Sequence, residues 1–243
     1  MSVLIIIPAR MKATRLPNKP LADIGGVPMI VQVWRRAVES NVGDVIVACD
    51  GAEIAQAITA AGGVAVLTDP NHPSGSDRIW EALTKHEAGK KSYDVILNLQ
   101  GDVPTLEPRL LQELLAPLAD TEVDIATLAV AITRDDEHQN PSVVKVVLAL
   151  KDKVKSGRAL YFTRCSAPYG EGTRYHHIGV YAYRRAALER FVSLPPSPLE
   201  QREKLEQLRA LEAGMRIDAV VVDTVPLGVD TPEDLARARE LLQ

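Results

Sequence analysis

The stretch Ser2–Pro20, SVLIIIPARMKATRLPNKP, decides which fold the rest of the chain must complete. Its first part, Val3–Ile7, is a short, apolar and mostly β-branched run, which predicts a buried strand that Pro8 should stop. Four cations follow on a segment that has prolines but no helical periodicity: Arg10, Lys12, Arg15 and Lys19. Ligands of open α/β folds bind outside the carboxyl ends of parallel strands, so this stretch predicts a phosphate-binding loop after a buried strand.

The spacing of this loop excludes the two common glycine-rich phosphate motifs. It matches neither the Walker sequence GxxxxGK[ST] nor the dinucleotide fingerprint GxGxxG. The cations themselves must therefore neutralise most of the charge of a bound phosphate. The alternative interpretation is a solvated, charged surface loop, because basic clusters often have no ligand.

The composition is that of an ordinary soluble globular protein with an aliphatic core. Hydrophobic residues make up 46% of the 243 residues, charged residues 25% and aromatic residues only 4%. This length allows one large domain or two small ones. The net charge of −4 gives the whole molecule no attraction for nucleic acid or anionic lipid, so a bound anion must be held by a local cationic patch.

Nothing in the sequence predicts export or membrane insertion. The chain enters its first expected strand at Val3 without a basic and then apolar leader. Its apolar runs fall short of the roughly 20 residues that a membrane-spanning helix needs. The only cysteines, Cys49 and Cys165, give neither a disulfide framework nor a CxxC motif, so we expect idle thiols in a reducing cytoplasm.

Strands and helices alternate along the chain, which predicts an α/β fold. Expected strands at 3–7, 44–49 and 64–67 are separated by expected helices at 28–41 and 52–61, and this order predicts a parallel sheet with right-handed crossovers. Further along, we expect helices at 77–85, 107–118, 184–191, 199–213 and from Thr231 onward, and strands at 93–99, 125–132, 143–150, 175–183 and 217–222.

One segment, at about 151–175, interrupts the alternation of strands and helices. We expect an irregular insertion there, which covers a partner subunit. The sequence contains no internal repeat, low-complexity tract or flexible linker. Residues 1–243 are therefore predicted to form a single domain with one irregular insertion.

Asp102 and Asp230 are the candidate metal ligands. Each comes after an expected strand, and Asp102 lies at the sheet edge where the cationic loop should also emerge. Magnesium takes one or two carboxylates together with substrate phosphate oxygens, so a carboxylate beside phosphate-binding cations indicates a divalent ion between them. The alternatives are a turn-forming aspartate at 102 and, at 230, an Asx turn that supports the helix cap at Thr231.

Ser74–Arg78, SGSDR, is a turn of small residues that runs into an expected helix. Exposed amides and hydroxyls at a helix start suit an anion or the edge of a nucleotide base. The alternative is a plain helix cap with Ser76 as the N-cap residue. His176 and His177 are neighbours on an expected strand, so at most one of them faces a site. The sequence has no GxSxG, HExxH or metal-spaced histidine motif, and nothing argues for a covalent nucleophile.

Seven motifs spread along the chain carry a family resemblance: IPARMKATRLPNKPLADIGGVPMI, LNLQGD, HPSGSDR, ALYFTR, HIGVYAYR, PSPLEQREKLEQLR and GVDTPEDL. Together they resemble the 3-deoxy-manno-octulosonate (KDO) cytidylyltransferases, or CMP-KDO synthetases, over essentially the whole chain. The first motif is shared by sugar nucleotidyltransferases broadly, whereas LEQLR and GVDTPEDL together point to the KDO branch.

The resemblance implies a nucleotidyltransferase-type, Rossmann-like domain with a mixed, mostly parallel central sheet flanked by helices, and an arm that helps to form a homodimer. It implies a magnesium-dependent enzyme that makes CMP-KDO and pyrophosphate from CTP and KDO for lipopolysaccharide assembly. The implied CTP ligands are Ala9, Arg10, Arg15, Lys19, Ser74, Gly75 and Arg78. The implied KDO ligands are Gln100, Arg164, His177, Glu206 and Gln207. Asp102 and Asp230 would bind magnesium, and with Arg10 and Lys19 they form the implied catalytic set.

The chain departs from the family pattern at several places. Val103 stands where many relatives have an acid, and Ala13 stands where a serine is common. Cys165 and the shortened segment after Pro168 differ as well. Two alternatives stay open: a cytidylyltransferase for another substrate (sialic acid, 8-amino-KDO or a polyol phosphate), and a non-catalytic nucleotide-binding protein on the same fold. The joint presence of Arg10, Lys19, Asp102 and Asp230 argues against the non-catalytic alternative.

Overall fold

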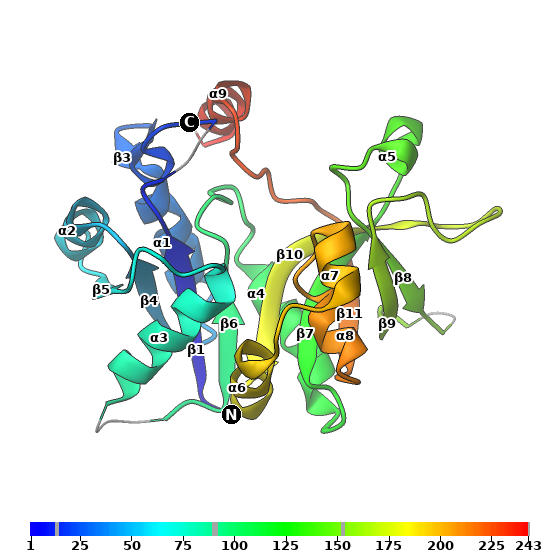
Figure 1. Cartoon of the computed structure of the whole chain (residues 1–243). Coiled ribbons are helices and arrows are strands. Elements are labelled where there is room, and N and C mark those ends of the chain that lie inside the picture. The colour runs from blue at the N-terminus through cyan, green and yellow to red at the C-terminus, as the bar shows by residue number, and fades with distance from the viewer. Residues whose placement is uncertain (13–14, 89–91, 152–153, 243) are drawn as a thin grey trace. The chain divides into compact units, whose positions relative to one another are not determined.

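The computed structural model describes residues 1–12, 15–88, 92–151 and 154–242 (Figure 1). Ala13, one of the departures from the family pattern, lies outside these residues. Contacts divide the chain into two compact units: unit 1 is Met1–Gln112 with Pro226–Gln243, and unit 2 is Glu113–Val225. The C-terminal segment therefore belongs to the unit that the N-terminus begins. That residues 1–243 form a single domain stays a prediction.

The described strands of the unit 1 sheet are all parallel, as the alternation of strands and helices predicts. β1 (Val3–Ala9) lies between β4 (Asp44–Cys49) and β6 (Val95–Asn98), and β5 (Val64–Leu67) pairs with the other edge of β4. The side chains of Leu4–Ile7 are fully buried, as expected where both faces of a parallel strand are covered.

β1 does not stop at Pro8, so that prediction is wrong. Pro8 lies level with Ala48, and the strand continues to Ala9. β6 ends at Asn98, opposite Ile6, so beyond that residue β1 has a described partner in unit 1 on one side only. A proline is tolerated at such a position because one side of the strand needs no ladder hydrogen bond.

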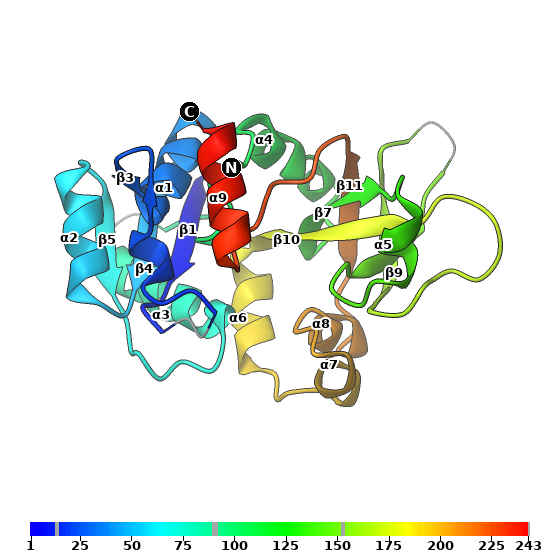
Figure 2. The same ribbon diagram turned by 90° about the horizontal axis from the view of Figure 1, so that it is seen from above.

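Three helices cover the two faces of the unit 1 sheet. α1 (Met29–Glu39) and α2 (Ala52–Ala60) pack against each other on one face, and α3 (Gly75–Glu87) packs against β1 on the other (Figure 1 and Figure 2). The shorter elements are η1 (Lys19–Leu21), the hairpin strands β2 (Asp23–Ile24) and β3 (Val27–Pro28), and α4 (Arg109–Leu114).

The starts of two helices differ slightly from the prediction. Pro28 is the N-cap residue of α1 and not its first helical residue. α3 begins two residues early because the Ser74 side chain accepts a hydrogen bond from the Asp77 amide. The N-cap residue is therefore Ser74 and not Ser76, since a serine oxygen three residues before a free amide is the usual cap geometry.

The C-terminal segment is held in unit 1 by its apolar face. α9 (Pro232–Leu241) starts at the predicted cap, and Thr231 and Asp234 form a reciprocal capping box. Leu235 and Ala238 of α9 are buried in one cluster together with Ile24 and Met29. This packing determines where the residues just before α9 lie.

Unit 2 contains a mixed sheet that is mostly antiparallel. Its strands are β7 (Ile125–Ala131), β8 (Lys145–Ala149), β9 (Ser156–Thr163), β10 (Tyr175–Arg184) and β11 (Ile217–Val222). β7 and β11 are parallel, whereas the other described pairs of this unit are antiparallel. A mixed sheet was expected, but its mostly parallel character holds in unit 1 only.

Part of the predicted irregular insertion is regular. β9 pairs with β8 on one side and with β11 on the other, so residues 156–163 are an ordinary strand of the sheet. The strand was not predicted, because the basic residues before it interrupt the apolar pattern of the sequence. β9 also alternates between buried and exposed positions at Gly157–Leu160, which is the period expected of a half-covered strand.

The helices of unit 2 differ from the predicted ones. They are α5 (Asp135–Gln139), in the expected acidic loop, α6 (Arg185–Ser193), α7 (Pro198–Glu203) and α8 (Leu208–Glu212). α5 was not expected, α6 is close to the expected helix at 184–191, and α7 and α8 replace the single helix expected at 199–213. The 3₁₀ helix η2 (Ala116–Ala119) takes the end of the expected helix at 107–118.

A single long helix at 199–213 is a wrong prediction, because Lys204 adopts a left-handed conformation with φ of 58°. Arg209 of α8 pairs with Glu200 of α7 through two hydrogen bonds of 2.8 and 2.6 Å, which folds the two helices onto each other.

Both cysteines are free thiols, as expected; Cys49 is buried and Cys165 is exposed. Burial, followed by the charge of Asp50, raises the pKa of the Cys49 thiol to about 11, so this thiol is unreactive. Among the described residues, none of the helices combines the length and the apolar character that crossing a membrane would require.

Candidate active site

The charged loops of unit 1 meet at the carboxyl ends of β1 and β6. The chain continues from β1 to β4 and β5 on one side of it and then returns to β6 on the other side. Such a reversal leaves a crevice outside the strand ends, because neighbouring connections leave toward opposite faces. A cavity of about 420 Å³ lies at this position.

This cavity brings together every unit 1 residue that the sequence analysis assigned to a substrate or metal. These residues are Ala9, Arg10, Arg15, Lys19, Ser74, Gly75, Arg78, Gln100, Asp102 and Asp230. The loop after β1 supplies one wall, and the segment leading into α3 supplies another. Lys12 also lines the cavity, as do His72 and Pro73, which the sequence analysis did not single out.

The ammonium group of Lys19 lies between two carboxylates. Its Nζ donates to Asp102 Oδ2 at 2.7 Å and to Asp230 Oδ1 at 2.8 Å. The other Asp230 oxygen, Oδ2, is 3.1 Å from the Arg15 guanidinium. The Lys19 side chain is only 16% exposed, so it depends on these partners to remain charged. The carboxylates of the two aspartates thus converge on one point, and the Lys19 ammonium is the cation at that point.

These contacts shift the pKa values of Lys19 and Asp230. Burial would lower the pKa of Lys19, but the charge and hydrogen bond of Asp102, followed by those of Asp230, raise it above its ordinary value. Burial would raise the pKa of Asp230, but the hydrogen bonds and charges of Lys19 and then Arg15 lower it. Both groups are therefore ionised throughout the neutral pH range.

Tight backbone contacts explain why these side chains meet. A Cβ at Gly101 would lie 2.8 Å from the carbonyl oxygen of Pro8, so only glycine lets the turn before Asp102 approach β1 so closely. The Val229 amide donates to the Asp102 carbonyl oxygen at 2.8 Å. Asp230 is the next residue after Val229, so this hydrogen bond also holds Asp230 beside the turn that contains Asp102.

The two carboxylates fit a magnesium ion by their chemistry. Both reach within 2.8 Å of one cationic atom, so both can approach a single cation. Within the described part of the chain, no group of three or more His, Cys, Asp or Glu side chains could hold a metal. Magnesium often takes one or two carboxylates and completes its shell with phosphate oxygens and water, so this pair suits an ion that binds with a phosphate substrate.

The wall next to α3 presents a helix start and a buried arginine. The Ser74 hydroxyl donates to Asp77 Oδ2 at 2.7 Å, and a Cβ at Gly75 would meet nothing closer than Pro8 at 3.7 Å. Arg78 is 3% exposed, and its Nη1 donates to Thr68 Oγ1 at 2.6 Å. The guanidinium is therefore held in one orientation from behind the cavity.

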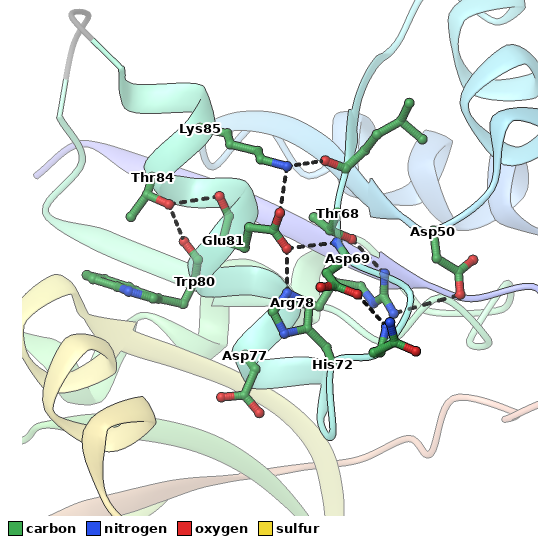
Figure 3. A network of polar contacts seen from close by, with 12 residues as sticks. Asp50, Thr68, Asp69, His72, Asp77, Arg78, Trp80, Glu81, Thr84 and Lys85 are labelled. Carbon is green, nitrogen blue, oxygen red and sulfur yellow. Dashed lines mark hydrogen bonds and ion pairs between the residues drawn. The ribbon is translucent and has the colours of Figure 1, made fainter.

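Glu81 of α3 connects the loop before this wall to the helix. Its Oε2 accepts from the Asp69 amide at 2.9 Å and pairs with His72 Nε2, and its Oε1 is 2.5 Å from Lys85 Nζ (Figure 3). Burial would raise the pKa of Glu81, but the contacts with Lys85, Asp69 and His72 lower it to about 2. An ionised carboxylate only accepts hydrogen bonds, so Nε2 of His72 carries a proton.

The other predicted substrate residues, Arg164, His177, Glu206 and Gln207, belong to unit 2. Arg164 follows β9, and its guanidinium donates to the carbonyl oxygens of Glu203 at 2.8 Å, Pro141 at 2.9 Å and Lys204 at 3.3 Å. Its backbone amide also donates to the Glu203 side chain at 2.9 Å. These contacts use three of the five guanidinium N–H groups and set the orientation of the planar fork.

His177 is a buried and neutral residue of β10. It is 7% exposed, its Nε2 is 3.0 Å from Thr127 Oγ1, and its ring meets the edge of Phe162. Burial, followed by the charge of His176, lowers the pKa of His177 to about 3. Tyr181, which sequence analysis did not single out, lies beside the His177 ring with a centroid distance of 5.5 Å.

Glu206 and Gln207 lie in the break between α7 and α8, which a continuous helix would not have formed. Gln207 is 7% exposed, and its Nε2 has no hydrogen-bond partner among the described residues. A buried amide without a partner carries a desolvation penalty of about 1–3 kcal/mol, which a ligand oxygen would remove. Burial, the charge of Tyr183 and the charge of Glu206 raise the pKa of Tyr181, which places Glu206 near that ring.

Comparison with known proteins defines first the class of this chain. The sequence profile of the cytidylyltransferase family, described as "Cytidylyltransferase", matches residues 4–217. A solved structure of a CMP:2-keto-3-deoxy-manno-octonic acid synthetase complexed with CTP has a TM-score of 0.90 and 41% identity, and the match covers 99% of this chain and 98% of that one. The fold is thus that of a cytidylyltransferase.

Two full-length relatives narrow this class. A 3-deoxy-manno-octulosonate cytidylyltransferase from Paramagnetospirillum magneticum is 60% identical over 240 residues, and one from a Bradyrhizobium species is 64% identical over 240 residues. Each match covers 99% of this chain and 97% of the relative. The chain belongs to the 3-deoxy-manno-octulosonate cytidylyltransferase family.

The Glu81 contacts predict how unit 1 responds to acid. Because the pKa of Glu81 is lowered from 4.5 to about 2, its contribution to stability is present above pH 4.5 and is lost as the pH falls toward 2. We expect Glu81→Gln to abolish about 1–2 kcal/mol of the stability that the wild type loses over this range, after allowance for partial exposure. Urea unfolding at a series of pH values measures this difference.

The matched control is Glu39→Gln on α1, where the glutamate side chain is 50% exposed and pairs with Arg36. This variant should lose stability on acidification as the wild type does. Equal acid dependence in wild type and Glu81→Gln would contradict the assigned role of Glu81.

Proposed function

We infer that this protein transfers CMP from CTP to the anomeric hydroxyl of KDO, giving CMP-KDO and pyrophosphate. Its full-length relatives bear the name of that activity at 60% and 64% identity. The observation that carries the proposal is the Lys19 ammonium held between Asp102 and Asp230 in a cavity lined by further cations. A phosphate donor and a cation-dependent transfer are the chemistry that such a site supports best.

We propose that CTP binds in the cavity of unit 1. Arg10, Arg15 and Lys19 would hold the triphosphate; Arg10 is exposed, and the Arg15 side chain is 66% exposed. Ser74 and Gly75 form the start of α3, and their amide and hydroxyl groups would bind the nucleotide. Arg78 and Ala9 would complete the pocket, because both line the same cavity.

Asp102 and Asp230 are the proposed magnesium ligands. When bound, the ion would act as a Lewis acid that polarises phosphate oxygens and offsets the charge of the triphosphate. The Lys19 ammonium already lies where both carboxylates can reach it, and phosphate oxygens would compete with them for its three N–H donors. The Lys19 ammonium would then donate hydrogen bonds to the substrate instead of to the two carboxylates.

The proposed reaction is an in-line displacement at the α-phosphorus of CTP. The anomeric oxygen of KDO forms a bond to this phosphorus and gives up its proton, while the bond to the pyrophosphate oxygen breaks. Phosphoryl-type transfer needs positioning and charge stabilisation more than covalent participation by the protein. Arg10, Arg15 and Lys19 would stabilise the negative charge that develops on the departing pyrophosphate.

Gln100 in unit 1 and Arg164, His177, Glu206 and Gln207 in unit 2 are the proposed KDO ligands. A planar guanidinium suits the carboxylate of a sugar acid, and the Arg164 fork is already oriented by its backbone contacts. The unpartnered amide of Gln207 suits a sugar hydroxyl. Neutral His177 can accept or donate a hydrogen bond without adding a charge.

We further propose that the enzyme is a cytoplasmic homodimer that serves lipopolysaccharide assembly, as the family resemblance implies. Three large apolar side chains of segment 151–175 are exposed, which supports an interface there: Val154 at 47%, Leu160 at 54% and Tyr169 at 104%. A second chain packed on this segment would remove these apolar side chains from water, which is favourable.

Pyrophosphate release tests the activity. We expect release on mixing the protein with CTP, KDO and magnesium, and much slower release with sialic acid or 8-amino-KDO in place of KDO. Faster turnover of one of those acids would reassign the substrate. No release with any sugar acid would favour a non-catalytic nucleotide-binding protein.

Asp102→Asn tests the proposed metal role. The amide keeps the shape of the side chain but removes its charge, so we expect kcat to fall about a hundredfold or more at saturating magnesium. The control is Glu107→Gln, an exposed acid of the following segment that pairs with Arg109, which should retain wild-type turnover. Retained turnover in a folded Asp102→Asn protein would remove the metal role from this residue.

Leu160→Lys tests the proposed dimer. A charge placed in an apolar interface should lower the dimer affinity at least about tenfold, because the ammonium would lose water without gaining a partner. Light scattering behind a sizing column at several protein concentrations measures the change. Val38→Lys on α1, where the valine is 43% exposed, is the control and should not change the mass. A monomeric wild type at all concentrations would rule out the dimer.

A further inference from the structure

The turn that follows β4 contacts the cationic loop from behind. Asp50 and Gly51 form this turn, at the same sheet edge at which the loop leaves β1. The Met11 amide donates to Asp50 Oδ1 at 2.9 Å. The Asp50 side chain is only 7% exposed, so this hydrogen bond is shielded from water. Because Met11 directly follows Arg10, the bond fixes the backbone where the cations begin.

Gly51 provides a second and independent link to Met11, because the space beside its Cα is filled by the Met11 side chain. A Cβ at position 51 would lie 2.9 Å from Met11 Cγ, closer than real side chains approach. The backbone of Gly51, with φ of −126° and ψ of 140°, is an extended conformation that any residue adopts. A side chain at this position would therefore push against the Met11 side chain, which belongs to the start of the loop.

The other side of the Asp50 carboxylate faces Arg78. Oδ2 of Asp50 is 3.8 Å from Arg78 Nη2, and the arginine side chain is 4% exposed (Figure 3). This distance is too long for a hydrogen bond, but two opposite charges shielded from water attract each other strongly at such a separation. One carboxylate thus contacts both walls of the cavity. A carboxamide could not replace it, because an amide has only one acceptor oxygen and would turn a donor toward Met11 or Arg78.

We propose that the Asp50–Gly51 turn positions the cationic loop for CTP, with Asp50 as a positioning residue that also orients Arg78. Asp50 does not line the cavity itself and acts through the Met11 amide and the Arg78 guanidinium. The inference rests on the proposed CTP site. It adds that the geometry of this site is set by the strand next to β1 as well as by β1.

The test compares Asp50→Asn and Gly51→Ala in steady-state kinetics. We expect each variant to raise the KM for CTP about fivefold to tenfold and to leave the KM for KDO within about twofold. Direct titration with CTP in the absence of KDO should show the same loss of affinity. Gly51→Ala leaves the carboxylate in place, so it carries the test even where Asp50→Asn does not fold.

The matched control is Asp44→Asn, at the opposite end of the same strand. Asp44 Oδ2 accepts a hydrogen bond from the Tyr93 hydroxyl at 2.7 Å, so this variant also removes a charge that holds a side chain. It should lower the melting temperature without changing the KM for CTP. Equal rises of both KM values in Asp50→Asn and Gly51→Ala, or KM values like those of Asp44→Asn, would overturn the inference.

Arg10→Ala separates this inference from the proposed CTP site. If Asp50 acts through the loop, adding Asp50→Asn to Arg10→Ala should weaken CTP binding by a smaller factor than Asp50→Asn does alone. An unchanged CTP affinity in Arg10→Ala would overturn the proposed site and the inference together. If Arg10→Ala weakens CTP binding but Asp50→Asn and Gly51→Ala do not, the inference is overturned and the proposed CTP site stands. Equal factors in both backgrounds would show that Asp50 does not act through the loop.

Discussion

The chemistry of unit 1 depends on one interaction, the ammonium of Lys19 between the carboxylates of Asp102 and Asp230. Two carboxylates that converge on one point repel each other, and a cation between them removes this repulsion. A mostly buried lysine would lose its charge without an anionic partner. The two aspartates therefore raise the pKa of Lys19, and Lys19 lowers the pKa of Asp230. This triad joins the loop after β1, the turn after β6 and the segment before α9, so it can form only once all three have been brought together.

The cations around the cavity divide into two kinds, and the difference is physical. Arg10, Lys12 and Arg15 are exposed to water. Any ion pair that an exposed side chain forms contributes little to the stability of the fold. Lys19 and Arg78 are held by partners and point in fixed directions. A triphosphate would meet preoriented charges near the strand ends and adaptable charges at the rim. This arrangement takes the place of the glycine-rich cradle that the sequence lacks.

Unit 2 presents a contrasting environment, because two of its four proposed KDO ligands, His177 and Gln207, are buried neutral groups. His177 is neutral because burial lowers its pKa to about 3, and the Gln207 amide is buried without a partner among the described residues. Such groups suit the hydroxyls of a sugar and would do little for a triphosphate. Glu206 and Gln207 occupy the break between α7 and α8, so the same feature that shortens the helices also presents these side chains. Buried neutral groups beside one guanidinium would suit a sugar acid, whose hydroxyls outnumber its single carboxylate.

Local patterns in the sequence determined the parallel sheet of unit 1, the bounds of β4, β5 and β11, and the cap at Thr231, because each depends on residues a few positions apart. The family resemblance named ten of the residues that line the cavity, from Ala9 to Asp230. His72, Glu81, Asp50 and Tyr181 could not be predicted from the sequence, since a single polar residue in a loop, a helix or a strand carries no periodic signal.

Only the tertiary structure decided the remaining features. Pro8 stays in its strand because β6 ends early, and the helix expected at 199–213 breaks because Arg209 reaches back to Glu200. Lys19 finds Asp230 because α9 packs on Ile24 and Met29. Each of these outcomes depends on which distant segments come into contact. Burial of apolar surface and pairing of charges across the fold determine those contacts. A local stretch of sequence contains only one partner of each contact, so it cannot predict them.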